Sequence, residues 1–145
     1  MVFNYVIRPG TEKWEELNSK EEKFKVCQIP EDVLENITTE DLLNSVLNYP
    51  LLYDVFAYND LHQGIEYLEK NFNGLNELFK RKELTRMLID FYSKEKIVED
   101  EEKKFKIIFL EILITYPKIY KELSKAEKIE LENISILKKR DKEKI

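Results

Sequence analysis

Apolar residues recur every three or four positions along most of the chain, which is the spacing of one face of an α-helix. The clearest runs lie within residues 38–49, 61–72, 75–92 and 124–137. Only 3 Gly and 4 Pro occur in 145 residues, too few for the tight turns of a many-stranded sheet. We therefore predict an all-α fold, a compact multi-helical single domain over residues 1–145 with about seven to eight helices.

Polar residues at helix-capping spacing mark where the predicted helices begin. Ser19 precedes Glu22 by three residues, and Ser124 precedes Glu127 by the same interval, which is the spacing of a capping box. A hydroxyl at such a position accepts a hydrogen bond from a free amide of the first helical turn. Further predicted caps are Thr11, Thr38 with Asp41, and Asn59 or Asp60.

Two Tyr-Pro pairs interrupt the helical pattern, because the residue before a proline disfavours helical conformation. We predict helix–proline–helix corners at Tyr49-Pro50 and Tyr116-Pro117. The sequences around them, LNSVLNYPLLYDVF from residue 43 and LEILITYPKIYKEL from residue 110, are similar. A chance match of two such corners explains this similarity at least as well as a duplication, since a repeat fold needs more than two copies.

Other local signals predict where helices end, where two helices come close together and which helix lies in the core. Pro30 is expected to end one helix and open the next, and Asn73-Gly74 is predicted to be a turn. Gly64 is expected to mark a close helix contact. Residues 94–104 are predicted to form a solvated loop and the first turn of the next helix. Residues 105–114 are apolar almost all round, which favours a helix at the centre of the core, with a β-strand as the alternative.

The net charge of −5 conceals an uneven distribution along the chain. Residues 26–69 contain 9 Asp and Glu and no Lys or Arg, whereas residues 1–25 are balanced and residues 70–145 carry an excess of four positive charges. A negative protein lacks the broad positive field with which proteins bind nucleic acid or anionic membranes. We therefore expect no nucleic-acid partner, and the acidic block, residues 26–69, is the feature that needs an explanation.

Two explanations of the acidic block are open. Clustered carboxylates attract cations, so the block is either a docking face for a basic protein or a weak cation site. Alternatively, its acids stabilise helix N-termini, where the helix dipole favours negative charge. Five of the acids lie at predicted helix starts: Glu31, Asp32, Glu40, Asp41 and Asp60. The acids that this second explanation leaves over are Glu35, Asp54, Glu66 and Glu69.

The sequence excludes several kinds of site and segment. One Cys and one His exclude an intramolecular disulfide and any zinc site built on two or more such ligands, and we predict no metal and no cofactor. No P-loop, nucleophile elbow, calcium loop or HExxH motif is present. The longest apolar run, residues 107–114, is far shorter than the roughly 20 residues of a transmembrane helix. Without an export signal, the sequence as given predicts a cytoplasmic protein, or an exported one if a signal segment has been removed.

Residues 53–62 hold the densest collection of hydrogen-bonding side chains in the chain. In a catalytic interpretation, His62 near Asp54 or Asp60 acts as a general base and Tyr58 positions a substrate. In a structural interpretation, His62 is solvated, Asn59 and Asp60 are caps, and the tyrosines lie at the edge of the core with their hydroxyls in water.

Cys27 and the two ends of the chain also have structural interpretations. Cys27 and Phe24 share an apolar stripe, so a buried thiol is expected, whereas a nucleophilic thiol would need His62 as its base. Residues 1–10 are expected to be frayed. The basic tail, residues 138–145, is expected to be solvated and to place favourable charge at a helix C-terminus, with an anionic surface as the alternative partner.

Short motifs are spread between Pro9 and Lys94. They are Pro9-Gly10-Thr11 with Trp14, Cys27-Gln28-Ile29-Pro30-Glu31, Leu47-Asn48-Tyr49-Pro50-Leu51, Ala57-Tyr58-Asn59 and Phe72-Asn73-Gly74-Leu75. This set resembles a pattern that recurs in a family of uncharacterised bacterial proteins, many of them exported. The family has no established activity, so the resemblance implies no mechanism. It implies that six residues serve the shared architecture as caps, corners or a common polar surface: Gln28, Tyr49, Pro50, Tyr58, Asn59 and Asn73.

The acidic block and the absence of a catalytic motif favour a non-catalytic helical protein that acts through protein–protein contact. Its partner would present a basic surface to acidic residues within 31–69. The alternative is a small helical enzyme or small-ligand binder that uses His62, Asp54 and Tyr58 in a pocket. The candidate binding surface comprises Glu35, Asp54, Tyr58, Asn59, His62, Glu66 and Glu69.

Overall fold

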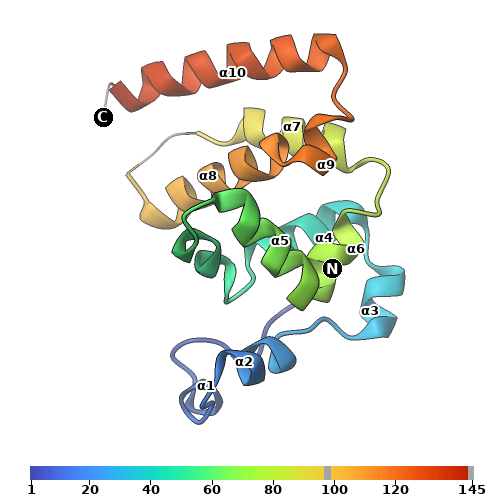
Figure 1. The fold of residues 1–145 in the computed structure, drawn as a ribbon, viewed down its shortest axis with the longest axis vertical. Coiled ribbons are helices and arrows are strands. Elements are labelled where there is room, and N and C mark those ends of the chain that lie inside the picture. The colour runs from blue at the N-terminus through green and yellow to red at the C-terminus, as the bar shows by residue number, and fades with distance from the viewer. Residues whose placement is uncertain (97–98, 144–145) are drawn as a thin grey trace. The chain divides into compact units, whose positions relative to one another are not determined.

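The structure, a computed structural model, describes residues 1–96 and 99–143, with side chains up to residue 140. Within these residues all regular secondary structure is helical, 69% of the residues are in helices and no strand occurs (Figure 1). The all-α prediction is therefore confirmed. The predicted number of helices is wrong, because the described residues form 11 helices rather than seven to eight.

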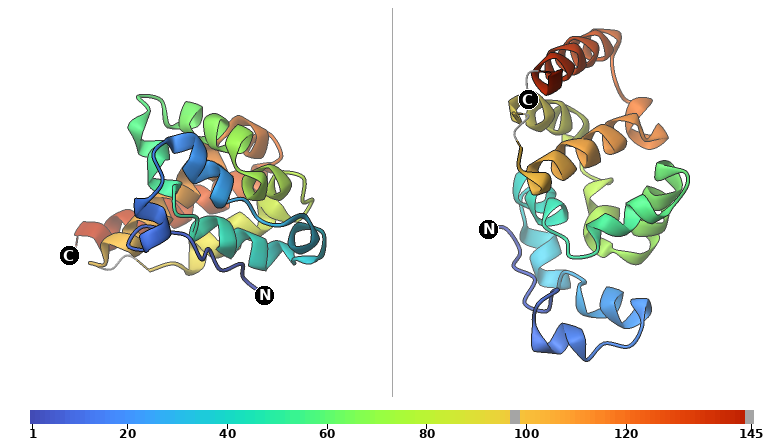
Figure 2. Two further views of the ribbon diagram at one scale, coloured as in Figure 1. Left: turned by 90° about the horizontal axis from the view of Figure 1, so that it is seen from below. Right: turned by 90° about the vertical axis from the view of Figure 1, so that its left-hand side faces the viewer.

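The chain divides into two compact units, Met1–Lys82 and Glu83–Ile145, and each is described by itself. The N-terminal unit contains α1 (Glu12–Glu15), α2 (Lys20–Val26), α3 (Glu31–Asn36), α4 (Thr39–Leu47), the 3₁₀ helix η1 (Leu52–Ala57), α5 (Leu61–Asn71) and α6 (Asn73–Leu78). The C-terminal unit contains α7 (Leu84–Lys94), α8 (Glu101–Thr115), α9 (Pro117–Tyr120) and α10 (Lys125–Glu143) (Figures 1 and 2). The single-domain organisation stays a prediction.

The predicted helix caps are confirmed. The hydroxyls of Thr11, Ser19 and Thr38 accept hydrogen bonds from the amides of Trp14, Glu22 and Asp41. Of the two candidates before α5, Asp60 is the cap, since its Oδ1 accepts from the His62 amide at 2.9 Å. Ser124 and Glu127 form a reciprocal capping box with distances of 3.0 and 3.1 Å. Local side-chain chemistry thus determines where these helices begin.

The additional helices arise at the corners, where the chain forms short turns of helix. After α4 ends at Leu47, Pro50 lies in a turn and η1 begins at Leu52, so the Tyr49-Pro50 corner leads into a 3₁₀ helix. At the other corner Pro117 is the first residue of α9, a position where its missing amide costs no hydrogen bond. Pro30 is the N-cap of α3 rather than its first residue.

The expected turn at Asn73-Gly74 is wrong, because both residues belong to the first turn of α6. The chain breaks one residue earlier, at Phe72, which has an extended backbone (φ −128°, ψ 112°). Gly74 is needed for packing: a Cβ there would overlap the ring of Phe72 and lie 2.9 Å from Cδ1 of Ile29. Gly64 is confirmed as a close contact, since a Cβ there would lie 2.6 Å from the carbonyl oxygen of Val55 in η1.

Gln28 and Asn73 form a reciprocal amide clamp between two corners of the N-terminal unit. Gln28 Nε2 donates to the carbonyls of Phe24 (2.8 Å) and Asn71 (2.6 Å), and its Oε1 accepts from the Asn73 amide (2.8 Å). Asn73 in turn accepts from the Ile29 amide (2.9 Å) and donates to the Ile29 carbonyl (2.6 Å). The clamp satisfies backbone groups at the ends of α2, α5 and α6, which no helix can satisfy internally.

The core of the N-terminal unit centres on stacked aromatic rings. The rings of Tyr49 and Phe72 are 3.7 Å apart at an interplanar angle of 10°, and Tyr5 lies against both. Tyr5 is only 4% exposed, and its hydroxyl donates to the Ser45 carbonyl at 2.7 Å. Residues 1–10, which the sequence leaves as a frayed end, are therefore anchored on α4.

Arg81 ties the loop after α6 to two other helix ends. Its guanidinium donates to the carbonyls of Leu34 (3.2 Å) and Ile37 (3.0 Å) and to the Thr39 hydroxyl (3.1 Å). Its Nε also pairs with Glu77 at 3.3 Å. A single side chain thus satisfies carbonyls at the end of α3 and holds the start of α4 beside α6.

The C-terminal unit is built around α8, and its centre is confirmed as a buried helix rather than a strand. The buried residues of α8 are Ile107, Phe109, Leu110, Ile112, Leu113 and Ile114. The expected loop and first helical turn within residues 94–104 are confirmed, since α8 starts at Glu101 with Asp100 as its N-cap, although residues 97–98 lie outside the described part. The expected solvated tail is wrong at Lys138, which is only 6% exposed, whereas Lys139 and Arg140 are exposed and α10 continues to Glu143.

We expect replacement of Gln28 by alanine to lower the free energy of unfolding by about 2–4 kcal/mol, because it leaves the Asn71 carbonyl and the Asn73 amide without partners, whereas the Phe24 carbonyl still accepts from the Cys27 amide. Urea denaturation followed by circular dichroism measures this loss. The control is Gln63→Ala, which removes the exposed amide side chain on α5 and should change stability by less than about 0.5 kcal/mol. Equal stabilities of the two variants would show that the clamp contributes nothing.

Tyr49 provides a second test, because its hydroxyl is buried and no described residue hydrogen-bonds to it. Tyr49→Phe keeps the stacked ring and should leave stability unchanged or raise it by up to about 2 kcal/mol. Tyr5→Phe, the control, loses the bond to Ser45 and should cost about 1 kcal/mol. Thermal unfolding of both variants decides the matter: a Tyr49→Phe protein less stable than Tyr5→Phe would contradict this account.

Candidate functional site

The five acids assigned to helix starts lie where the sequence places them. Glu31 and Asp32 are in the first turn of α3, Glu40 and Asp41 are in the first turn of α4, and Asp60 caps α5. Asp41 also accepts a hydrogen bond from the N-terminal ammonium group, which lowers the pKa of its carboxyl. The predicted positions of these acids at helix starts are confirmed.

Two candidate residues, Asp54 and Tyr58, are held by partners within the N-terminal unit. Asp54 Oδ2 pairs with Lys20 Nζ at 3.5 Å, and the same ammonium lies 5.4 Å from the centre of the Tyr67 ring. Tyr58 packs on Tyr67 with ring centres 5.5 Å apart. Lys20 and Tyr67 therefore bring these two candidates into one cluster between α2, η1 and α5.

The other candidates on α5 and before it lie at the surface. Asn59 is exposed and adjoins the cap Asp60, and the amide of His62 donates to that cap. Glu66 pairs with Lys70 one turn later at 3.6 Å. Glu69, like His62, is half-buried. An exposed pair of this kind contributes little to stability, so Glu66 is a partly neutralised surface charge.

The catalytic interpretation places His62 near Asp54 or Asp60. The structure pairs Asp54 with Lys20, and Asp60 accepts a hydrogen bond from the main-chain amide of His62 as the cap of α5. Tyr58 likewise faces Tyr67. Neither the hollow nor the groove described below is lined by Asp54, Tyr58 or His62. The observed geometry of Asp54 and Tyr58 is structural packing around Lys20 and Tyr67.

Glu35 lies apart from the other candidates, on a small hollow between α3 and α6. The hollow has a volume of about 160 Å³ and is lined by Glu31, Leu34, Glu35, Asn73, Asn76, Glu77 and Lys80. Glu77 is engaged by Arg81. Within residues 1–96 and 99–140, no ion pair involves Glu31 or Glu35. The hollow thus presents two exposed carboxylates that no described side chain neutralises.

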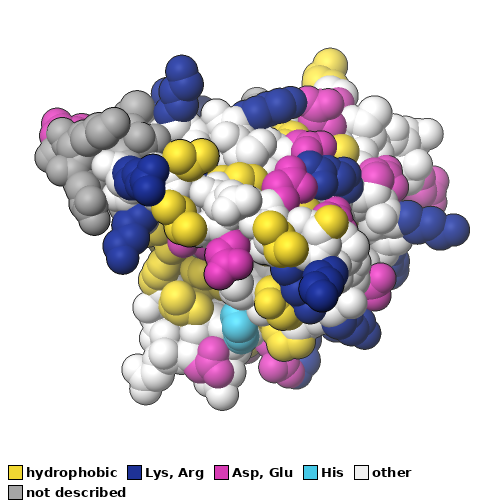
Figure 3. Space-filling model, turned by 90° about the horizontal axis from the view of Figure 1, so that it is seen from above, with side chains coloured by type: hydrophobic (Ala, Val, Ile, Leu, Met, Phe, Trp, Pro, Cys, Tyr) yellow, Lys and Arg dark blue, Asp and Glu magenta, His cyan; other side chains and the backbone are white. Residues whose placement is uncertain are grey.

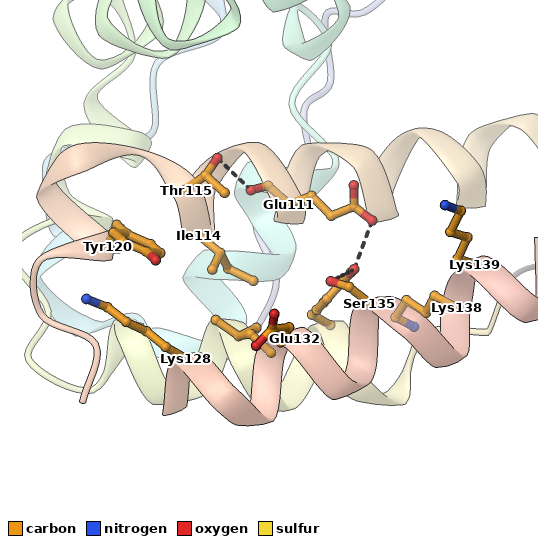
Figure 4. A pocket seen from close by; sticks show the side chains of 11 residues that line it. Glu111, Ile114, Thr115, Tyr120, Lys128, Glu132, Ser135, Lys138 and Lys139 are labelled. Atoms are coloured by element: carbon orange, nitrogen blue, oxygen red, sulfur yellow. Dashed lines mark hydrogen bonds between the residues drawn. The ribbon is translucent and has the colours of Figure 1, made fainter. Parts of the chain in front are cut away.

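A larger groove lies in the C-terminal unit between α8 and α10, with α9 at one end (Figure 4). Its volume is about 740 Å³. Figure 4 shows Glu111, Ile114 and Thr115 on the α8 wall, and Glu132, Ser135 and Lys138 on the α10 wall. Tyr120 and Lys128 lie together at the α9 end, with the ammonium 4.6 Å from the ring centre. The lining combines aliphatic, aromatic and charged groups.

A buried tyrosine organises the polar side chains of this groove. Tyr92, only 2% exposed, donates from its hydroxyl to Glu111 Oε1 at 2.9 Å and lies 3.3 Å from the Ser135 hydroxyl. Burial and the nearby charge of Glu111 raise the pKa of Tyr92 to about 12. Lys138 donates to the Glu95 carbonyl and lies 4.9 Å from the Tyr92 ring centre. Tyr92 therefore stays protonated at neutral pH and orients Glu111.

Sequence reasoning missed the groove and most residues that shape it. Neither Glu111 nor Tyr92 is among the site residues predicted from the sequence. The available signal was a lone acid within an otherwise apolar helix, since such an acid needs a polar partner when it is half-buried. That partner, Tyr92, lies 19 residues away, so spacing along the chain does not identify it.

The outer face of α10 exposes apolar side chains. Ile129, Ile136 and Leu137 are 53%, 48% and 58% exposed, and their spacing places them on one side of the helix. Figure 3 looks onto the face that carries α10, where hydrophobic side chains lie among both signs of charge. Among the helices that the structure describes, none is long and apolar enough to cross a membrane. The described side chains also contain no group of three or more potential metal ligands of the His, Cys, Asp and Glu types.

Cys27 is buried, as expected, and is 1% exposed. Its Sγ is directed at the Ile7 carbonyl at 3.7 Å. Burial raises the pKa of the thiol to about 11, whereas an activated nucleophile needs a lowered pKa. Cys27 is therefore a packing residue of the N-terminal unit.

We expect Cys27 to resist alkylation by iodoacetamide in the native protein at pH 8. Its burial disfavours the reactive thiolate form and also keeps the reagent from reaching the sulfur atom. Alkylation should reach the rate of a free thiol only in denaturant. The control places a thiol at the neighbouring exposed position, in Val26→Cys combined with Cys27→Ala, and should react at least about 100-fold faster when followed by mass spectrometry. Similar native rates would contradict the burial of Cys27.

The raised pKa of the Cys27 thiol also predicts how the free energy of unfolding depends on pH. The contribution of the buried neutral thiol is retained below about pH 9 and is lost as the pH rises towards 11.

Comparison with known proteins leaves the resemblance described above as a prediction. No protein-family model, no curated protein and no solved structure matches the chain.

Proposed function

We propose that the protein is a non-catalytic binding protein that acts through protein–protein contact, with the acidic hollow between α3 and α6 at the centre of its contact surface. The observation that carries this proposal is the pair of exposed carboxylates, Glu31 and Glu35, which share one hollow without an ion pair among the described residues. Glu35 is not in the first turn of α3, so the helix dipole does not account for it.

The size of the hollow favours a partner side chain over a free ligand. Pockets for small molecules usually enclose about 300–1,000 Å³. The hollow, at about 160 Å³, is large enough for part of one long side chain. Lysine and arginine combine that shape with a charge that complements Glu31 and Glu35. A basic residue of a protein partner therefore fits this site better than a separate small molecule.

The surroundings of the hollow support recognition by charge. Asn76 and Lys80 lie on the same rim, and the exposed acids Asp32 and Glu40 lie close by in sequence. Lys80 reduces the negative potential without cancelling it, because two carboxylates without an ion pair, Glu31 and Glu35, line the hollow with one ammonium, while Glu77 is paired with Arg81. Negative potential of this kind accelerates association with a basic partner and selects against acidic ones.

Other observations are compatible with a contact function. The exposed apolar side chains on α10 resemble surfaces that proteins use for association. The competing catalytic proposal has less support, because Asp54 is engaged by Lys20 and Tyr58 by Tyr67.

The test is a charge reversal at the hollow, Glu31→Lys with Glu35→Lys and Glu40→Lys. We expect the association rate with a bound partner to fall at least about tenfold, and the remaining association to depend less on salt. Partners are first captured from the source cells with the unaltered protein and then measured individually by surface plasmon resonance.

A matched control reverses the same number of charges elsewhere on the N-terminal unit, with Glu12→Lys, Glu16→Lys and Glu21→Lys. Glu12 and Glu21 are first-turn acids, like Glu31 and Glu40, so both triple variants lose similar helix stabilisation. Circular dichroism checks that both fold. The proposal is wrong if the control variant loses partners as strongly as the hollow variant, or if neither loses any.

A further inference from the structure

The groove of the C-terminal unit has the dimensions of a small-molecule site. Its volume of about 740 Å³ lies within the usual range of about 300–1,000 Å³ for ligand pockets. Ile114 and Leu131 supply apolar wall, and Tyr120 adds an aromatic surface at one end. Such a lining suits a ligand with an apolar body and a small number of polar groups.

The positive charges that line the groove are largely engaged by the protein itself. Lys128 lies over the ring of Tyr120, at 4.6 Å from its centre. Lys138 lies over the ring of Tyr92 and donates to the Glu95 carbonyl. The Lys138 ammonium therefore has both an aromatic and a carbonyl partner, whereas Lys128 is exposed and its ammonium contacts an aromatic ring.

The negative charges are available. Glu111 uses Oε1 to accept from Tyr92, and no described side chain or amide bonds to its Oε2. Glu132 extends from the opposite wall (Figure 4), and it forms no ion pair with any described residue. The Tyr92 hydroxyl also fixes the orientation of Glu111, which lowers the entropic cost of using this carboxylate to bind a ligand.

We propose that the groove binds a small organic amine, whose ammonium group bonds to Glu111 and whose apolar body lies along Ile114 and Leu131. Glu132, from the facing helix, adds a second negative charge. This site is independent of the proposed protein contact, because it lies in the other unit and shares no residue with the acidic hollow.

An organic anion fits the same groove less well. A ligand carboxylate beside Ile114 would meet Glu111 from one wall and Glu132 from the other. Lys139, at the end of the groove away from Tyr120, is the remaining cation in the lining. A neutral alcohol with the same apolar chain as the amine would contact the apolar part of the groove but would form no ionic contact with Glu111.

The probes are hexylamine, hexanoate and hexanol, which share an apolar chain and differ in charge at pH 7. Isothermal titration calorimetry should show saturable binding of hexylamine with a dissociation constant of about a millimolar, and at least about tenfold weaker binding of the other two. Hexanoate binding as tightly as hexylamine, or no binding of hexylamine, would overturn the proposal.

Glu111→Gln is the decisive variant, because the amide oxygen still accepts from Tyr92 while the negative charge is lost. We expect it to weaken hexylamine binding about tenfold or more and to leave hexanol binding unchanged. The control, Glu122→Gln, removes an exposed acid of the same unit outside the groove and should leave the affinity unaltered. Equal affinities of the two variants for hexylamine would overturn the role of Glu111. Circular dichroism establishes that both variants are folded.

An ammonium group can come from a free amine or from a lysine side chain of a peptide. Nα-acetyl-lysine amide contains a complete lysine side chain, with its four-carbon chain and ammonium group, and a peptide group on each side. Tighter binding of this compound than of hexylamine would identify a lysine-bearing peptide as the source, and weaker binding would identify a free amine. Both results uphold the amine site, provided that Glu111→Gln weakens the binding of the tighter compound.

Discussion

The side chains of Gln28 and Asn73 satisfy backbone groups that the helices of the N-terminal unit leave open. This unit consists of helices of 4 to 11 residues, and helices this short are marginal alone because their unpaired ends are a large fraction of their length. Gln28 joins the ends of α2 and α5 to the start of α6. Arg81 likewise donates a hydrogen bond to the Leu34 carbonyl of α3. The acidic hollow follows from this arrangement: Asn73 lines it, and α3 begins two residues after the clamped Ile29.

Helix starts and proline corners could be predicted from the sequence because their chemistry is local. Ser124 and Glu127 cap α10 through bonds that span three residues, and Pro117 occupies the first position of α9. The acids at the starts of α3 and α4 follow from the same local rule, which is why their positions could be predicted. The all-α class needs only this level of information together with the scarcity of glycine and proline.

Features that depend on contacts distant in the sequence could not be predicted in the same way. Asn73-Gly74 has the composition of a turn, yet Asn73 bonds to Ile29, 44 residues away, and Gly74 is small because the Phe72 ring and Ile29 both pack against it. Lys138 looks like part of a solvated basic tail, yet Tyr92 and the Glu95 carbonyl bury its ammonium group. In each case a tertiary partner overrides what the residue type favours on average.

The sequence also does not reveal which acidic side chains of the candidate sites are neutralised by a partner. A count of acids and bases along the chain treats every carboxylate as equally available, whereas pairing decides which ones can act on another molecule. The pairing of Glu66 with Lys70 is visible in the sequence as a one-turn spacing, but that of Asp54 with Lys20 is not. Glu35 and Glu111 differ from these because their neighbours leave carboxylate oxygens open, one on an exposed helix and one beside a buried tyrosine. Since a free carboxylate needs no distinctive sequence around it, only the folded arrangement separates it from one that is already neutralised.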